Sequence, residues 1–429
     1  MCSIGEDDFG DEGGVHSMVP DVKRDESQSS IETERLCNKC KQPGAAYKLA
    51  FREPECKDCF LNYVRHKFRA ALGSSKVLPK NANVLLVFDG SAQSLVLLDM
   101  LHHAQTQNTF KRLHCNATVL YIDDYAVNGE DDKDYEKLLR DVQKTCGTYE
   151  HFECFLLPLV KADYVKDLIF DLKLLEENYF STVAKQKLDF KGAVDCLKSL
   201  TSRQDFIKHY RSKIIALAAK HFQCQFAFKA DISSDLASDL LAAIALGRGG
   251  SAALDVALVD NRLDDDIKIV RPLKDLTEEE IGLYIKAQNL PLLDHRIYGN
   301  DCGPSASLQN LTKSFVKDLQ QNYSSTVSTV FRTGSKIASQ IGDDNNKTEG
   351  CCKFCKSPLD YQDSTTLLAI EFSRIVSECG IKTEDDTSEL SMEAQKHVAG
   401  DIEGCDLTQM CHACRNIYAD SNNNDILLQ

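Results

Sequence analysis

The sequence lacks any apolar run long enough to cross a membrane. Its longest runs, residues 84–88 and 236–246, are far shorter than the roughly 20 residues that a membrane-spanning helix needs. The acidic N-terminus also lacks the basic and then apolar segments of a secretory signal. These absences predict an intracellular, cytoplasmic protein that does not associate with a membrane.

An excess of positive charge is also lacking. The 429 residues contain 50 Lys and Arg against 65 Asp and Glu, a formal net charge of −15. This balance argues against strong, independent binding of nucleic acid, because attraction to phosphates supplies most of the non-specific affinity. Residues 1–34 hold ten acidic residues against Lys23 and Arg24. We expect this segment to be a disordered acidic tail, because it also lacks hydrophobic periodicity.

Cysteine, in contrast, is abundant, with 18 residues. In a reducing compartment, paired Cys-x-x-Cys motifs indicate metal ligation rather than disulfides. Cys37 and Cys40 are followed by Cys56 and Cys59, a spacing typical of zinc ribbons. We expect a structural zinc site in a module spanning 35–82, since four sulfur ligands leave no open position. A redox-active pair or an iron–sulfur cluster are the alternatives.

A second cysteine module is expected over residues 341–418. Its pairs are 55 residues apart, so the pattern is looser, and an acidic stretch at 381–404 lies between them. Cys351 could substitute for the first ligand, and His412 is interpreted as a bystander. Residues 419–429 are expected to form a tail. The predicted second set of zinc ligands is Cys352, Cys355, Cys411 and Cys414.

Between the modules, residues 83–340 alternate between strand-like and helix-like segments. Such alternation predicts βαβ units and a mostly parallel sheet, hence an α/β core. Residues 160–190 suggest a helical insertion. Thr277 and Glu280 fit a capping box at a helix start. Strands are expected at 84–88, 117–122, 152–157, 225–229 and 267–270, and helices at 94–103, 132–146, 206–222, 232–246 and within 308–331.

The first of these strands ends in a small-residue turn, Asp89-Gly90-Ser91-Ala92-Gln93-Ser94. A turn of this kind between strand and helix can bind phosphate through backbone N–H groups. Gly90, Ser91 and Ser94 suit that role, whereas the Asp89 carboxylate would repel a phosphate. An ordinary strand–helix turn is the competing interpretation.

The whole layout resembles the tRNA thiolation family of adenine-nucleotide α-hydrolases, whose sheet carries a PP-loop. Catalytic members have a loop of the form Ser-Gly-Gly-x-Asp-Ser, and here only Gly90 and Ser94 match it, while Asp89 and Gln93 replace the first Ser and the acid. Within that family, four further segments resemble the branch named cytoplasmic tRNA 2-thiolation protein 2. They are residues 246–249, 270–276, 307–312 and 325–334.

The resemblance implies a degenerate PP-loop-like core and a role in 2-thiolation of the wobble uridine in Lys, Glu and Gln tRNAs. It further implies a non-catalytic subunit in a heterodimer with the catalytic thiolation subunit. Sulfur would come from a thiocarboxylated ubiquitin-related modifier. Two other functions remain open: a zinc-containing protein–protein adaptor without an RNA role, and an active ATP-dependent enzyme with an atypical loop.

The resemblance implies a tRNA substrate, and cationic side chains are the groups that contact its phosphates. Arg65, Lys67 and Arg69 lie in a basic stretch beside the first cysteine module, where a solvated helix face is the alternative interpretation. Arg248 follows a predicted helix and could contact an anion, or simply belong to a helix C-cap. We take these four as candidate RNA contacts.

Overall fold

The fold was analysed in a computed structural model. It describes residues 36–50, 52–74, 76–107, 112–128, 132–175, 179–264, 266–323, 325–338, 351–359 and 409–421. The acidic tail expected at 1–34, the stretch expected at 381–404 and most of the expected C-terminal tail lie outside these residues.

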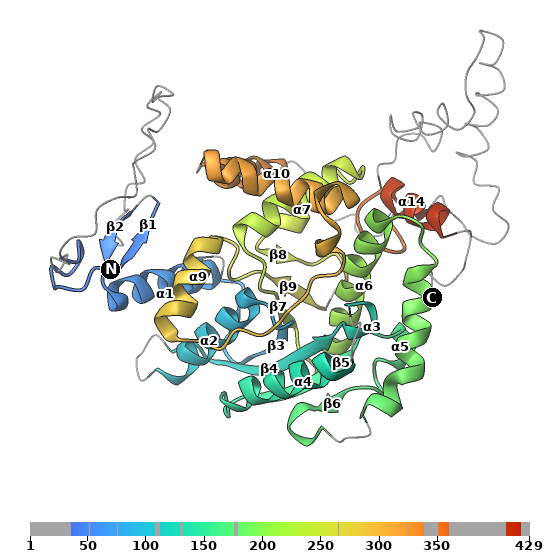
Figure 1. Ribbon diagram of the computed structural model, residues 1–429, viewed down its shortest axis with the longest axis horizontal. Coiled ribbons are helices and arrows are strands. Elements are labelled where there is room, and N and C mark those ends of the chain that lie inside the picture. Colours follow the sequence, from blue (N-terminus) through green and yellow to red (C-terminus); the bar gives the residue numbers. More distant parts are fainter. Residues whose placement is uncertain are drawn as a thin grey trace, which may run out of the picture.

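A seven-stranded sheet in the order β6-β5-β4-β3-β7-β9-β8 forms the centre of the molecule (Figure 1). The four pairings among β3, β4, β5, β7 and β9 are parallel, and the edge strands β6 and β8 are antiparallel. A separate hairpin is formed by β1 and β2. The strands are β1 (Tyr47–Leu49), β2 (Arg52–Glu55), β3 (Ala82–Phe88), β4 (Cys115–Asp123), β5 (Glu153–Pro158), β6 (Phe170–Asp171), β7 (Phe226–Phe228), β8 (Val259–Asp260) and β9 (Lys268–Val270).

Helices cover both faces of this sheet. The α-helices are α1 (Lys57–Ser74), α2 (Ala92–Thr106), α3 (Tyr125–Asn128), α4 (Asp132–Gly147), α5 (Tyr179–Asp195), α6 (Leu200–His221), α7 (Ser233–Ala245), α8 (Ala252–Val256), α9 (Glu278–Gln288), α10 (Leu308–Asn322), α11 (Thr326–Ala338) and α14 (His412–Asp420). Short 3-10 turns are η1 (Ala162–Tyr164), η2 (Leu172–Leu174), η3 (Asn300–Cys302) and η4 (Pro304–Ala306).

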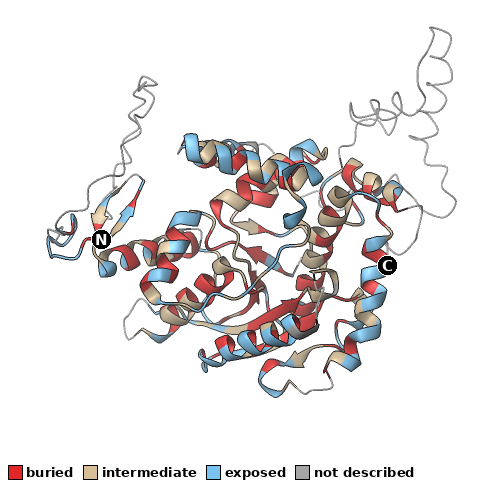
Figure 2. Ribbon diagram, in the orientation of Figure 1, coloured by how far each residue is buried: buried red, intermediate tan, exposed pale blue. Residues whose placement is uncertain are grey.

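The side chains of β3 explain how two cores form around one sheet. Val84, Leu86 and Phe88 pack on the face covered by α1, α2, α4 and α9. Leu85 and Val87 point to the other face, against α5 and α6. Successive residues of a strand alternate between faces, so a continuous apolar run buries both sides. Figure 2 shows the resulting buried strands within a shell of partly exposed helices.

The structure confirms the α/β fold with a mostly parallel sheet and cysteine clusters toward both ends of the chain. The predicted capping box is present: Thr277 accepts from the Glu280 amide, and Glu280 accepts from the Thr277 amide. The region 160–190 differs from the predicted helical insertion, because it contains η1, β6 and η2 before α5 begins. The last described helix, α14, ends at Asp420. No helix in the described part of the chain is both long and apolar enough to span a membrane.

Candidate metal centres and the loop after β3

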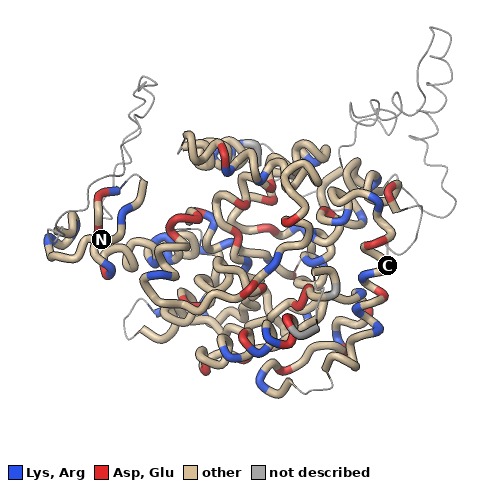
Figure 3. The backbone as a smooth tube through the Cα atoms, in the orientation of Figure 1, with Lys and Arg blue, Asp and Glu red and all other residues tan. Residues whose placement is uncertain are grey.

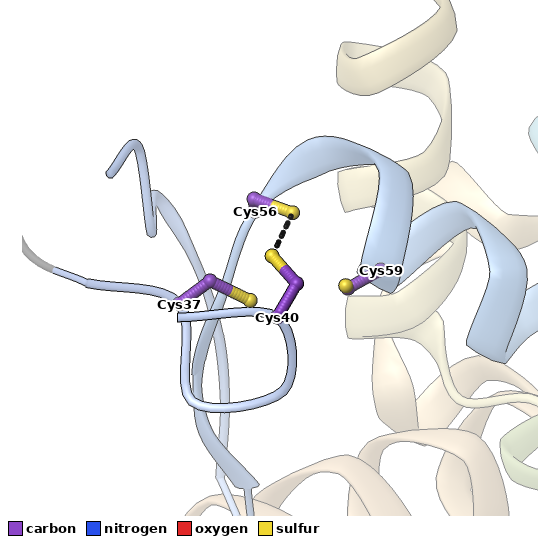
Figure 4. Close-up of side chains that lie close together, drawn as sticks. All are labelled: Cys37, Cys40, Cys56 and Cys59. Atoms are coloured by element: carbon purple, nitrogen blue, oxygen red, sulfur yellow. Dashed lines mark hydrogen bonds between the residues drawn. The ribbon is translucent and has the colours of Figure 1, made fainter. Parts of the chain in front are cut away.

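The first four predicted ligands come together at the edge of the molecule. Cys37 and Cys40 lie in a turn before β1, whereas Cys56 and Cys59 lie at the start of α1 (Figure 4). All four sulfur atoms are within 4.8 Å of one another, and the Cys40 and Cys56 Sγ atoms are 3.6 Å apart. A tetrahedral site with metal–sulfur bonds of about 2.3 Å requires sulfur separations of about 3.8 Å. The cysteines therefore fit a tetrahedral metal ion.

Protonation of these thiols supports the same conclusion. Backbone hydrogen bonds, chiefly from Cys40, lower the pKa of Cys37 to about 6. Burial and hydrogen bonds to the other thiols raise the pKa of Cys59 to about 12. One thiolate therefore forms readily, but four at once need a cation among them, because neighbouring like charges oppose ionisation.

The second set of ligands also comes together, on the opposite side of the core. The sulfur atoms of Cys352, Cys355, Cys411 and Cys414 lie within 4.8 Å of one another. Cys351 is exposed and is not a member of this cluster, whereas Cys352 is fully buried. The structure therefore selects Cys352 from the two adjacent candidates. His412 is likewise not a member.

The second tetrad is packed against α6 of the core. The Phe354 ring stacks on Phe206, with centroids 5.6 Å apart. The Asp420 carboxylate accepts hydrogen bonds from the Ser199 amide and hydroxyl, each 2.9 Å long. Ile417 of α14 belongs to the core cluster around α6. The two cysteine tetrads therefore differ in their surroundings: the first lies at the periphery, and the second packs against the core.

Side chains of the loop after β3 accept hydrogen bonds from several of its own backbone amides. Asp89 Oδ1 accepts from the Ser91 amide at 3.0 Å, and Ser91 Oγ accepts from the Ser94 amide at 3.2 Å. Ser94 is fully buried and donates its hydroxyl to the Ser91 carbonyl. Gly90 has a φ of 83°, a left-handed conformation that glycine adopts without strain. Two of the amides that could cradle a phosphate at this helix start, those of Ser91 and Ser94, are thus bonded to loop side chains.

Asp89 is held in its charged form. Its carboxylate lies 3.6 Å from the Arg211 guanidinium. Burial alone raises its pKa, but Arg211, His295 and the hydrogen bond from Ser91 outweigh burial and bring that pKa below its usual range. The loop consequently carries a permanent negative charge of its own, which Arg211 of α6 partly balances.

A pocket of about 330 Å³ opens beside this loop, at the carboxyl ends of β3 and β4. Open α/β sheets bind ligands at this edge. Its lining includes Lys137, His295 and Arg296, together with the following six aspartates: Asp89, Asp123, Asp124, Asp134, Asp141 and Asp294. The acidic lining disfavours a nucleotide polyphosphate.

One wall of the pocket is fixed by hydrogen bonds to Asp123, which is fully buried. The Tyr179 hydroxyl and the Lys187 ammonium of α5 lie 2.7 and 2.6 Å from Asp123 Oδ2, and the Tyr135 hydroxyl of α4 also donates to it. The Tyr125 ring stacks on Tyr135. The sequence did not identify this group, because its members lie up to 64 residues apart.

Two of the three candidate RNA contacts on α1 are engaged with α9. Lys67 Nζ lies 2.6 Å from Glu280 Oε1, and Arg65 Nε donates to the Tyr284 hydroxyl at 3.2 Å. Arg69 lies near α2, where burial and the charges of Arg65 and Arg69 lower the pKa of His103. All three cations are half-buried. This part of α1 is a packed face rather than the solvated face that the sequence suggested as an alternative.

Arg248 belongs to the C-cap of α7, as one interpretation drawn from the sequence held, because its amide donates to the Ala243 carbonyl at 2.8 Å. Its side chain, however, is not available for an RNA contact. The residue is only 4% exposed, and its guanidinium forms a two-pronged ion pair with Asp205 at 2.7 and 2.8 Å. An RNA phosphate would have to displace that buried carboxylate to bind it. Sequence alone offered no signal for the pairing, because Asp205 lies 43 positions away on another helix.

The chain is similar to known proteins along its full length. The family model described as "Cytoplasmic tRNA 2-thiolation protein 2" matches residues 307–416. A protein of that name from Drosophila ananassae is 49% identical over 99% of this chain and 100% of the relative. The protein of the same name from Drosophila melanogaster is 48% identical over 100% of both chains.

A solved structure shares the fold. The U34-tRNA thiolase NcsA from Methanococcus maripaludis, with its 4Fe-4S cluster, aligns with a TM-score of 0.50 at 17% sequence identity. The alignment covers 72% of this chain and 89% of that chain. The likeness confirms the predicted fold class.

Proposed function

The chain belongs to the cytoplasmic tRNA 2-thiolation protein 2 family, and we propose that it acts in tRNA thiolation as the non-catalytic partner of a catalytic subunit of the same fold. The pair would add sulfur to position 2 of the wobble uridine in Lys, Glu and Gln tRNAs. A thiocarboxylated ubiquitin-related modifier would supply the sulfur. The cytoplasm is the compartment that the relatives' name implies.

The loop after β3 carries the non-catalytic part of this proposal. Its Asp89 carboxylate accepts a hydrogen bond from the Ser91 amide at the start of α2. A nucleotide phosphate would otherwise accept hydrogen bonds at this position. At about 4 Å and an effective dielectric constant near 20, two like charges repel by about 4 kcal/mol. Arg211 offsets part of that repulsion, but the surrounding aspartates add to it. Chemistry therefore falls to the partner's loop.

For the two cysteine tetrads we propose structural zinc. Four thiolates at tetrahedral spacing are the donor set that zinc prefers in closed sites, and a closed site has no position for a substrate. A zinc ion would join residues on both sides of the β1–β2 hairpin in the first module, and two distant segments in the second. An iron–sulfur cluster is the competing occupant.

The first cysteine module is also our proposed contact surface for tRNA. Residues 36–80 contain ten Lys and Arg against three Asp and Glu, a net of +7 within a chain of −15. Six of these ten basic residues lie in the hairpin and α1 (Figure 3). Because Arg65 and Lys67 pack on α9, exposed lysines are better placed for phosphate contacts. Four exposed lysines lie within the first cysteine module: Lys39, Lys41, Lys48 and Lys57.

Reconstituted wobble-uridine thiolation tests the division of labour. Ser94→Ala and Asp89→Asn in this chain should leave the rate of the assembled pair within about twofold of wild type, although loss of the buried Ser94 hydrogen bond should cost about 1 kcal/mol of stability. The matching Ser→Ala substitution in the partner's loop should abolish thiolation. Micromolar ATP binding by the isolated chain, lost in Ser94→Ala, would instead favour an active enzyme with an atypical loop.

A further inference from the structure

Arg248 lies between a carboxylate of the core and a cysteine of the second tetrad. It follows α7 in a turn that Gly247 begins with a φ of 87°. Its Nη1 and Nη2 atoms both donate to Asp205 of α6, and Nη2 also lies 3.5 Å from Cys414 Sγ. The Arg248 and Asp205 side chains are 2% and 4% exposed. Water therefore does not replace either contact.

A metal ion in the second tetrad would make this contact energetically important. A divalent ion with four thiolates has a net charge of −2, and three of these cysteines are at most 3% exposed. Burying such a charge is costly unless hydrogen bonds and opposite charges accompany it. At the first tetrad Cys40 is exposed, so solvent can screen the charge there.

The arrangement parallels the hydrogen-bonded groups that orient metal ligands in proteins. In such sites the side chain that ligates the metal is itself oriented by a hydrogen bond to a neighbouring group. Here Asp205 fixes the plane of the Arg248 guanidinium, and His209 Nε2 lies 3.4 Å from the same carboxylate. The next residue, Phe206, stacks on Phe354, between two of the cysteines. Two adjacent residues of α6 therefore reach both Cys-x-x-Cys pairs: Asp205 through Arg248, which contacts Cys414, and Phe206 through Phe354.

We propose that Arg248 is a positioning residue of the C-terminal metal centre, donating an N–H···S hydrogen bond to the Cys414 thiolate while Asp205 holds it in place. Arg248 would thereby join metal binding at residues 352–414 to the packing of α6 and α7. This inference rests on the proposal that the second tetrad holds a metal, and the first tetrad provides a control site in the same molecule.

Chelator competition on the full-length zinc protein tests the proposal. Arg248→Met should lower the apparent affinity of one of the two sites about 10- to 100-fold and leave the other unchanged. A Cys411→Ser variant identifies which site is affected. In cobalt-substituted protein, the sulfur-to-cobalt absorption of the second site should shift in Arg248→Met and return toward wild type in Arg248→Lys.

Arg248→Met leaves the Asp205 carboxylate buried without its ion-pair partner, which destabilises the fold. A second variant therefore separates loss of metal affinity from unfolding. Arg248→Met combined with Asp205→Leu replaces the buried ion pair by apolar side chains, an exchange that proteins often tolerate. The double variant should fold and still bind the second metal weakly. A second-site affinity equal to that of wild type, together with an unchanged cobalt spectrum, in the double variant would overturn the proposal. A wild-type protein without metal at the second tetrad would instead refute the metal site itself.

Discussion

At the scale of the residue, one carboxyl group that contacts the segment after β3, that of Asp235, has a shifted pKa. Gln93 lies at the start of α2, and its side-chain amide donates to Asp235 Oδ2 at 3.3 Å. Burial raises the pKa of Asp235 to about 7. An amide at 93 can donate to this carboxyl in either protonation state, whereas a carboxylate there would repel its ionised form.

Asp235→Asn should therefore stabilise the chain in a pH-dependent way. The folded chain keeps the Asp235 proton up to about pH 7, whereas the unfolded chain releases it near pH 4. Wild-type stability then falls as the pH rises from about 4 to 7. Chemical denaturation should show Asp235→Asn more stable by about 1–2 kcal/mol at pH 8, with the difference vanishing near pH 4.

Asp239→Asn is the matched control for that measurement, because Asp239 lies one turn further along α7 and pairs with Lys208. Its substitution should not reproduce the gain at pH 8. Equal stability of wild type and Asp235→Asn at both pH values would contradict the elevated pKa.

At the scale of the element, local signals in the sequence predicted structure well where they were strong. The apolar runs correctly predicted β3 and β4, and the capping box of Thr277 and Glu280 correctly predicted the start of α9. The two-residue strand β8 and the hairpin containing Pro54 were missed, because such short polar segments have no distinctive periodicity. Cysteine spacing identified both tetrads, since ligand spacing is itself local.

Pairings between distant elements could not be predicted. Arg65, Lys67 and Arg248 are cations that the sequence marks as available, yet each has a partner on another helix. Such partners depend on tertiary packing, which brings together residues far apart in the chain. The acidic pocket was missed for the same reason, because its aspartates come from the end of β4, from separate loops and from α4. Only Asp89 was identified beforehand.

The first cysteine module should depend on its metal. Structural zinc contributes directly to the free energy of folding, so Cys40→Ser should lower the zinc content by one ion per chain and destabilise residues 36–80. Hydrogen exchange should then rise in the hairpin while β3 and β4 stay protected. Cys302→Ser, at an exposed cysteine outside both tetrads, is the control and should leave zinc content unchanged. Wild-type protein containing iron and sulfide instead would exclude zinc as the occupant.

The exposed lysines of the first cysteine module should matter more for tRNA binding than Arg65 and Lys67 do. Changing Lys39, Lys41, Lys48 and Lys57 to Glu should weaken tRNA binding by the assembled pair and reduce its salt dependence. If all four contact phosphates, the slope of log K against log salt should fall by about 3. Subunit association should persist.

The matched control changes four exposed lysines elsewhere on the chain to Glu: Lys173, Lys185, Lys198 and Lys268. This variant has the same net charge as the first and should bind tRNA nearly as well as wild type. Equal loss of affinity in both variants would mean that overall charge, rather than the first module, determines binding.

For the whole molecule, charge separation explains why the chain would act as part of a pair. Residues 36–80 are strongly basic, whereas the chain as a whole carries −15. Long-range repulsion by the rest of the chain should therefore weaken tRNA binding by the isolated subunit. A partner with a functional loop would supply both the chemistry and further RNA contacts, so neither subunit would suffice alone.

The most direct test is the content of 2-thiouridine at the wobble position of Lys, Glu and Gln tRNAs after deletion of this chain, measured by mass spectrometry of purified tRNA. We expect the modification to disappear, and to return when wild-type chain or Ser94→Ala chain is supplied. The catalytic subunit should remain present in the deletion strain, which separates loss of activity from loss of the enzyme. Full 2-thiouridine in all three tRNAs without this chain would contradict the proposed role.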